Sequence, residues 1–422
     1  MHADPLDCQA PAPAQTRQTS APVRAHFCVA RLADDGRRDK LISRKYGRRR
    51  HPARDGPTPA MSPTRPPEFA TGRLLIFMIG LDVVDRLLGA PPDLPTWRVA
   101  DMANRKGILG TWLSSAVARG VELSDAEGAY LRRWEQRVET LHATGVELAD
   151  RYQATVLKGP AIARFYPDGL LRQSGDVDLF APSQDVLWSC VRDLVDRRGA
   201  VPQGVSILEG PEGVHVGVAM KWPAAEPHLD KPMGADVTTF TFAGDLRGVP
   251  VRIAPVPEQD LCGLFAVAEE RFQRKFRIKD LLDLLVLAEV LEQRLGDDLT
   301  EVVCEHAGRL ALAPELRQLI VRASEWVSLS ERWHRTADAL RPLARREKDL
   351  RRPGRQGVHR LSFGMPLDER PGAASRVDIH RRAGSSLVTT PVGTCLLTRR
   401  LVVDEDELTD ALDHARSLTT PS

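Results

Sequence analysis

The sequence lacks several features that mark out whole classes of protein. Aromatic residues make up only 5% of its 422 residues, and six cysteines stand at positions 8, 28, 190, 262, 304 and 395. Their spacing forms neither a CxxC metal knuckle nor a disulfide framework. The longest apolar run, residues 74–80, is far shorter than the roughly 20 residues of a membrane helix and lies too deep in the chain for a secretory signal. We therefore expect reduced thiols, no membrane segment and a cytoplasmic location.

An excess of charge of one sign is also absent. The chain has 59 lysines and arginines against 57 aspartates and glutamates, a net charge of +2. Duplex-binding proteins usually carry a basic face, so the charge gives no strong nucleic-acid signal. No GxxxxGK[ST] segment is present, which excludes a P-loop motif. No histidine or cysteine cluster has metal-ligand spacing, so we do not expect a zinc site.

The length predicts more than one structural unit. Residues 1–66 are rich in proline, alanine, arginine and threonine without an apolar period, which predicts a disordered tail. A translation start at Met61 is the alternative. The fold class that we expect is α+β, a small mixed-sheet core flanked by N-terminal and C-terminal helical regions. Its parts are a helical region at 70–153, the α/β core at 154–255, a second helical region at 256–350 and a small α/β appendage at 357–419.

Local signals place several elements within these parts. Ser124 and Glu127 fit a capping box at a helix start. Pro160 suits the first turn of a helix over 161–165, and Ser183 opens a helix that runs to Gly199. Residues 330–355 are arginine-rich and weakly patterned. Strands are expected at 156–157, 176–180, 214–219, 235–242, 249–253, 386–390 and 395–403, and a last helix at 405–417.

Asp176 and Asp178 stand two residues apart in the segment Gly-Asp-Val-Asp-Leu. Residues two apart on a strand point to the same face, so both carboxylates project together. Such carboxylates repel each other unless a cation lies between them. Mg²⁺ prefers one or two carboxylates together with substrate phosphates, and two ions about 4 Å apart can clamp the oxygens of a phosphoryl transfer. Two aspartates in this pattern alone are more often a solvated strand face. The surrounding sequence therefore decides whether they are a catalytic pair.

That context is a longer pattern over residues 156–180. It runs Val-Leu-Lys-Gly at 156–159, Tyr-Pro-Asp at 166–168, an arginine at 172 and Gly-Asp-Val-Asp-Leu at 175–179. The block resembles the signature of an uncharacterised nucleotidyltransferase family within the DNA polymerase β superfamily. Several spaced elements agree at once, so the resemblance is specific. It extends over roughly residues 75–330 and covers neither the tail nor the last 60 or so residues.

The resemblance implies a nucleoside triphosphate substrate and two Mg²⁺ ions. Lys158 and Gly159 stand where the superfamily has a glycine turn at a helix start, whose backbone N–H groups can hold a triphosphate. Lys158 would add a point charge, or it is an exposed lysine at a strand end. Asp176 and Asp178 would hold the metals.

Further nucleotide contacts are implied at residues flanking this block. Arg172 and Ser174, with Gly175, precede the carboxylates, and Arg172 offers phosphate a bidentate fork or forms an ordinary surface ion pair. Lys279 and Asp280 match a later helix of the family. They contact the nucleotide or are exposed helix charges.

The superfamily also implies a third carboxylate that activates the acceptor hydroxyl and shares the metals. Asp236 is our choice because it lies in a strand-like alternation, and Asp230 is the competitor. If residues 214–222 form the matching strand instead, the third acid is missing.

Two functions follow. The first is a Mg²⁺-dependent nucleotidyltransferase that moves a nucleoside monophosphate to the hydroxyl of an unidentified acceptor, a small molecule, peptide or protein, in natural-product or polysaccharide biosynthesis. The alternative is a catalytically degenerate nucleotide-binding or regulatory module of a biosynthetic or toxin–antitoxin operon.

Overall fold

The computed structural model describes residues 82–210, 213–245, 249–254, 256–351, 360–367, 376–382, 386–398 and 403–419. The predicted tail, the alternative start at Met61 and the apolar run at 74–80 lie outside the described residues. Within the described ranges, no helix has both the length and the apolarity to cross a bilayer.

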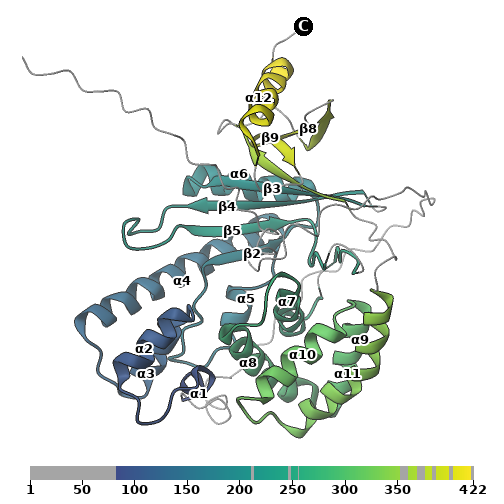
Figure 1. Ribbon diagram of the computed structural model, residues 1–422. Coiled ribbons are helices and arrows are strands. Elements are labelled where there is room, and N and C mark those ends of the chain that lie inside the picture. Colours follow the sequence, from purple (N-terminus) through teal and green to yellow (C-terminus); the bar gives the residue numbers. More distant parts are fainter. Residues whose placement is uncertain are drawn as a thin grey trace, which may run out of the picture.

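A nine-stranded mixed sheet forms the centre of the fold (Figure 1), in the order β1-β2-β5-β4-β3-β6-β9-β8-β7. β2 and β5 are parallel, and the other neighbouring strands of this sheet are antiparallel. The α+β class is confirmed at the level of a mixed sheet with helices. The strands are β1 (Thr155–Val156), β2 (Asp176–Phe180), β3 (Val201–Gly210), β4 (Gly213–Trp222), β5 (Met233–Thr238), β6 (Arg360–Pro366), β7 (Asp378–Arg381), β8 (Ser386–Thr390) and β9 (Gly393–Thr398).

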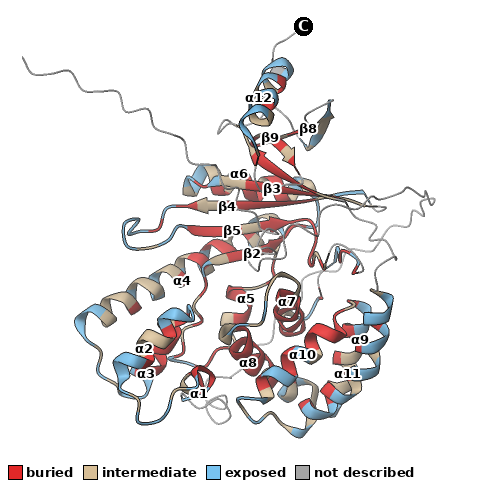
Figure 2. Cartoon of the chain, in the orientation of Figure 1, coloured by how far each residue is buried: buried red, intermediate tan, exposed pale blue. Residues whose placement is uncertain are grey.

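Helices pack on both faces of this sheet. α4 (Asp125–Tyr152) and α6 (Gln184–Arg198) share one apolar cluster with the inward side chains of β2 to β5. A second cluster on the opposite side joins α5 (Pro160–Ala163), α7 (Gln259–Gln273) and α8 (Ile278–Leu295), whose segments are mostly buried in Figure 2. The remaining helices are α1 (Val83–Leu88), α2 (Thr96–Arg105), α3 (Leu109–Ala118), α9 (Leu299–Arg309), α10 (Ala313–Ser324), α11 (Glu331–Leu350) and α12 (Glu405–Thr419).

Several local predictions are confirmed. Ser124 and Glu127 form the capping box of α4, and Pro160 occupies the first turn of α5. Ser183 caps α6, because its hydroxyl accepts from the Val186 N–H, and the helix ends at Gly199 in the left-handed region. β2 has the predicted bounds of residues 176–180.

Other local predictions are wrong. The expected strand at 249–253 is reduced to one isolated bridge between Phe242 and Arg252. Residues 201–210, to which the sequence assigned no strand, form β3. The arginine-rich stretch is weakly patterned, yet it contains the 20-residue helix α11, which lies within the helical region expected at 256–350. The buried stripe of α11 includes Trp333 and Leu340.

The C-terminal piece, expected as a separate appendage at 357–419, extends the central sheet. β6 pairs with β3 over five residue pairs, and β9, β8 and β7 follow outward. α12 packs against β8 and β9 through a small cluster around Leu387, Leu396 and Ala411.

Candidate functional site

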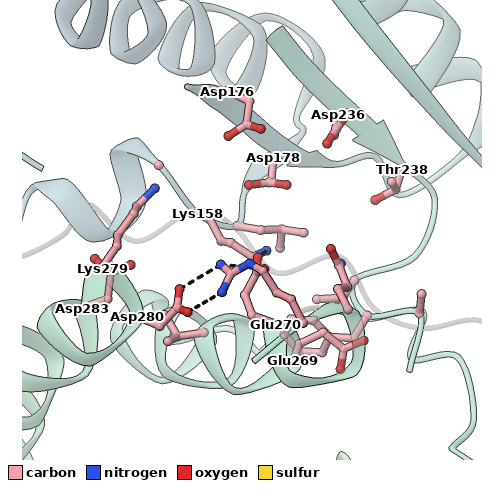
Figure 3. Close-up of a pocket in the computed structure, with 18 of the residues that line it drawn as sticks. Lys158, Asp176, Asp178, Asp236, Thr238, Glu269, Glu270, Lys279, Asp280 and Asp283 are labelled. Atoms are coloured by element: carbon pink, nitrogen blue, oxygen red, sulfur yellow. Dashed lines mark hydrogen bonds and ion pairs between the residues drawn. The ribbon is translucent and has the colours of Figure 1, made fainter. Parts of the chain in front are cut away.

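The two parallel strands, β2 and β5, place three carboxylates on one face of the sheet. Val177 and Leu179 are fully buried against α4 and α6, so Asp176 and Asp178 project to the opposite face, where they are half-buried. β5 runs parallel to β2 and pairs Asp236 directly with Asp178. Figure 3 shows the three side chains entering one pocket from the sheet side.

The geometry separates the alternatives for the third carboxylate. Asp230 lies in the loop before β5 and pairs with Arg133 of α4 at 3.4 Å, and it is not among the pocket-lining residues. β4 pairs with β5 and β3, not with β2. β5 is therefore the neighbour of the strand that carries Asp176 and Asp178, and Asp236 is the carboxylate that lies beside Asp178.

The turn between β1 and α5 requires glycine. Gly159 has φ 64° and ψ −109°, a conformation that is costly for any side chain. A Cβ at this position would also lie 3.2 Å from the Asp176 carbonyl oxygen. The glycine thus lets the turn approach the first aspartate closely, and α5 starts immediately after it at Pro160.

Lys158, the residue before this turn, lines the pocket with its ammonium tied to α7. Its Nζ lies 2.6 Å from Glu270 Oε1. Burial alone would lower the pKa of Lys158, but the carboxylates of Glu270 and Asp178 outweigh burial and raise it. Lys158 therefore remains a cation at neutral pH, and the expected exposed position at a strand end does not apply, since its side chain is only 18% exposed.

Arg172 is fully engaged within the protein. Its Nε and Nη2 donate to Asp283 of α8 at 2.7 and 2.8 Å, and Nη1 donates to the Ser174 hydroxyl at 2.6 Å. Tyr166 donates its hydroxyl to the same carboxylate at 2.6 Å. Burial would raise the pKa of Asp283, but Arg172 holds it below its usual value. The Arg172 guanidinium, which was expected to bind phosphate, thus binds Asp283. A phosphate contact of Arg172 or Ser174 stays a prediction.

The start of α8 contributes Lys279 to the pocket. Its ammonium makes no ion pair within 4.0 Å among the described residues, and burial followed by the charge of Arg172 lowers its pKa. The neighbouring Asp280 instead binds Arg274, the residue after α7, at 2.5 and 3.0 Å and accepts from the Arg277 backbone N–H at 2.7 Å. Asp280 therefore fixes the helix start, while Lys279 is the lysine that faces the cavity.

Arg137 of α4 joins the beginnings of the two carboxylate-bearing strands. Its Nη2 donates to the carbonyl of Gly175 at 3.1 Å and to that of Pro232 at 2.7 Å, and its Nη1 donates to the Lys231 carbonyl. The guanidinium also stacks on Trp134 at 5.4 Å. Because Gly175 precedes β2 and Pro232 precedes β5, Arg137 holds the two strands in register at their starts.

The pocket carries an excess of negative charge. It encloses about 1030 Å³, open mouth included. Seven carboxylates and four basic side chains line it, which leaves a formal charge of −3. As they stand, no three histidine, cysteine, aspartate or glutamate side chains in the described ranges have metal-binding spacing. The donor set of three carboxylates on adjacent strands nevertheless suits Mg²⁺, which accepts few protein oxygens and completes its shell with water and phosphate.

Comparisons of the chain with protein-family models, with curated proteins and with solved structures gave no match. The nucleotidyltransferase resemblance therefore stays a prediction that rests on the residues of the motif.

Sequence reasoning did not find four residues that build the site: Arg137, Thr241, Glu270 and Asp283. Asp283 had a readable signal, because it follows Lys279 by four residues on one helical face. Arg137 and Glu270 had none, since their partners lie 38 and 112 residues away along the chain.

Proposed function

We propose that this protein is a Mg²⁺-dependent nucleotidyltransferase that moves a nucleoside monophosphate from a nucleoside triphosphate to an acceptor hydroxyl. The observation that carries the proposal is the pairing of Asp236 with Asp178 on parallel strands, on the face that also presents Asp176. This pairing supplies the third carboxylate that the motif over residues 156–180 requires. The family assignment, within the DNA polymerase β superfamily, is part of the same proposal.

The reaction breaks one bond and forms one. The acceptor oxygen attacks the α-phosphorus, the bond from that phosphorus to the α–β bridging oxygen breaks, and pyrophosphate leaves. Asp176, Asp178 and Asp236 would hold two Mg²⁺ ions, which neutralise phosphate charge. Asp236 takes the proton of the acceptor hydroxyl. Catalysis of this kind depends mainly on positioning and charge.

The charge balance of the pocket agrees with this use. With two Mg²⁺ ions bound, the formal charge of the lining would be +1 instead of −3, and it would favour a triphosphate. Lys279 is the basic side chain most available to the phosphates, and Lys158 adds positive charge next to the Gly159 turn. Arg172, Ser174 and Gly175 also hold α8 and α4 against β2, and their contact with the nucleotide stays a prediction.

The acceptor belongs to one of three classes: a small molecule, a peptide or a protein. The resemblance favours natural-product or polysaccharide biosynthesis in the cytoplasm. A catalytically degenerate nucleotide-binding or regulatory module is the second candidate. It is favoured by the ion pairs of Lys158 with Glu270 and of Arg172 with Asp283, which occupy two basic groups near the glycine turn.

The test uses each α-labelled nucleoside triphosphate with Mg²⁺, alone and with host lysate as a source of acceptor. Wild type is compared with Asp176→Asn/Asp178→Asn, which keeps the size of both side chains. We expect label on an acceptor only with the intact acids. Nucleotide binding without transfer in every combination would favour the degenerate module.

A further inference from the structure

The pocket has two chemically different ends. One end contains the three aspartates of the sheet together with Lys158 and Lys279. The other is lined by the segment after β5 and by α7, with Phe240, Phe242, Ala243 and Val267 as its apolar members. α7 also presents the carboxylates of Glu269 and Glu270 to the pocket. A ligand that fills both ends carries phosphates at one side and a flat apolar group at the other. Ligand pockets commonly combine apolar walls with a few placed polar groups.

Thr241 is the polar group of this apolar end that lacks a partner. Its side chain is 7% exposed, and its Oγ1 has no hydrogen-bond partner among the described residues. The neighbouring threonines differ: Thr238 donates to the Phe240 carbonyl at 2.6 Å, and Thr239 accepts from the Val216 N–H at 2.8 Å. A buried hydroxyl without a partner costs stability, so one that lines a cavity points to a ligand.

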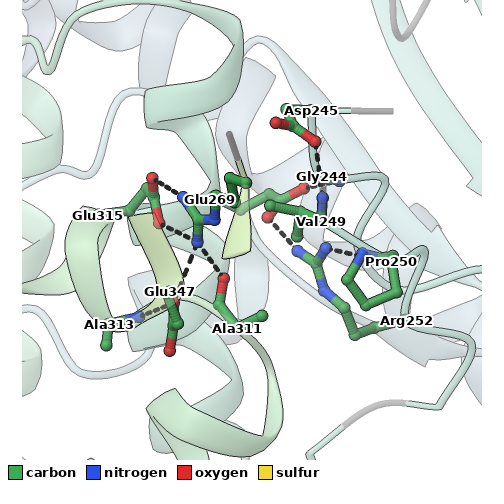
Figure 4. Close-up of polar contacts among 11 residues, drawn as sticks. Gly244, Asp245, Val249, Pro250, Arg252, Glu269, Ala311, Ala313, Glu315 and Glu347 are labelled. Carbon is green, nitrogen blue, oxygen red and sulfur yellow. Dashed lines mark hydrogen bonds and ion pairs between the residues drawn. The ribbon is translucent and has the colours of Figure 1, made fainter. Parts of the chain in front are cut away.

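Hydrogen bonds and an ion pair fix the position of the segment that carries Thr241. Its backbone N–H donates to the Arg252 carbonyl at 2.8 Å. The Arg252 guanidinium pairs with the buried Glu269, whose Oε1 also accepts from the Gly244 N–H at 2.6 Å (Figure 4). Asp245 accepts from the Val249 N–H at 2.9 Å. The apolar end is therefore formed before any ligand enters.

We propose that this apolar end is the nucleobase compartment and that the Thr241 hydroxyl hydrogen-bonds the edge of the base. The inference rests on the proposed function, because it takes the phosphates of the same nucleotide to lie at the aspartates. Gln273 of α7 lines the same pocket and adds an amide to it. The compartment thus makes the enzyme selective among the four bases.

The experiment measures binding of the α,β-methylene analogues of the four nucleoside triphosphates, which cannot be cleaved at the α–β bridge, and of inorganic tripolyphosphate. Both are titrated with Mg²⁺ into wild type, Thr241→Val and Thr241→Ser. Valine matches threonine in shape and removes only the hydroxyl, and serine keeps the hydroxyl. Because the hydroxyl has no partner in the protein, we expect the melting temperature of Thr241→Val to equal or exceed that of wild type.

We expect wild type to prefer one analogue and Thr241→Val to bind that analogue about tenfold more weakly, equivalent to about 1.4 kcal/mol. Tripolyphosphate affinity should stay unchanged, and Thr241→Ser should retain the preference. Unchanged preference in Thr241→Val, or equal weakening of tripolyphosphate, would overturn the compartment while leaving the proposed function standing. If neither analogue nor tripolyphosphate binds wild type, the proposed function fails and the compartment with it.

Discussion

Replacing Asp283 by asparagine tests whether the Arg172 fork is a structural ion pair. Arg172 and Asp283 are joined by two hydrogen bonds of 2.7 and 2.8 Å, and their side chains are 3% and 2% exposed. Removing one partner of such a pair leaves a buried charge and costs about 3–5 kcal/mol. We expect Asp283→Asn to lower the free energy of unfolding by roughly this amount in urea titrations at pH 7.

The pair also predicts a coupling and a pH dependence. The double variant Arg172→Met/Asp283→Leu removes both charges, so it should be more stable than Arg172→Met alone. Since Arg172 holds the pKa of Asp283 below its usual value, the stabilisation by this carboxylate is present above about pH 4 and is lost as the pH falls further. A loss of under 1 kcal/mol in Asp283→Asn would refute the structural role and restore Arg172 as a phosphate ligand.

Three further predictions concern other parts of the molecule. Arg137→Met should slow pyrophosphate release about tenfold, which corresponds to the loss of one or two hydrogen bonds, and should change the KM for nucleotide less. Arg137→Lys should restore only part of the rate. Equal rates of pyrophosphate release in wild type and Arg137→Met would contradict the aligning role of Arg137. Gly159→Ala should cost about 1–3 kcal/mol in urea unfolding because of its positive φ and the Asp176 carbonyl, and an unchanged midpoint would contradict this. Burial and the nearby Glu292 raise the pKa of Glu289 to about 7. The protonated form of Glu289 therefore stabilises the fold below about pH 4.5, and this stabilisation is lost as the pH rises through 7. The free energy of unfolding of Glu289→Gln should therefore exceed that of wild type by about 1–3 kcal/mol at pH 8 and match it at pH 4.5.

The part of the site that the sequence predicted depends on short spacing. Asp176 and Asp178 follow the two-residue period of a strand, and Ser124 with Glu127 follows the three-residue period of a capping box. Such signals act between neighbours in the chain, so they can be read without the fold. The choice of Asp236 needed only the additional expectation of an adjacent strand.

The parts that were missed depend on long-range pairing. In β3, Pro202 and Gly204 interrupt the strand pattern, and residues 204–208 are buried on both faces, so no alternation marks the strand. The expected strand at 249–253 has strand-like residues, yet its only strand pairing among the described residues is the bridge of Arg252 with Phe242.

α11 and the pairing of β6 with β3 were obscured for similar reasons. Most of α11 is polar, Pro342 lies within it, and its apolar stripe is narrow. The union of β6 with β3 joins segments more than 150 residues apart, which no local pattern reveals.

The central claim is that Asp236 completes a working transferase rather than a nucleotide-binding relic. The most direct measurement is pyrophosphate release by wild type and Asp236→Asn, with Mg²⁺ and host lysate as acceptor source, alongside nucleotide affinity for both proteins. We predict release by wild type, at least about 100-fold slower release by Asp236→Asn, in line with the loss of a general base, and affinities within about threefold of each other. Equal release by both proteins, or binding by wild type without any release, would contradict the claim.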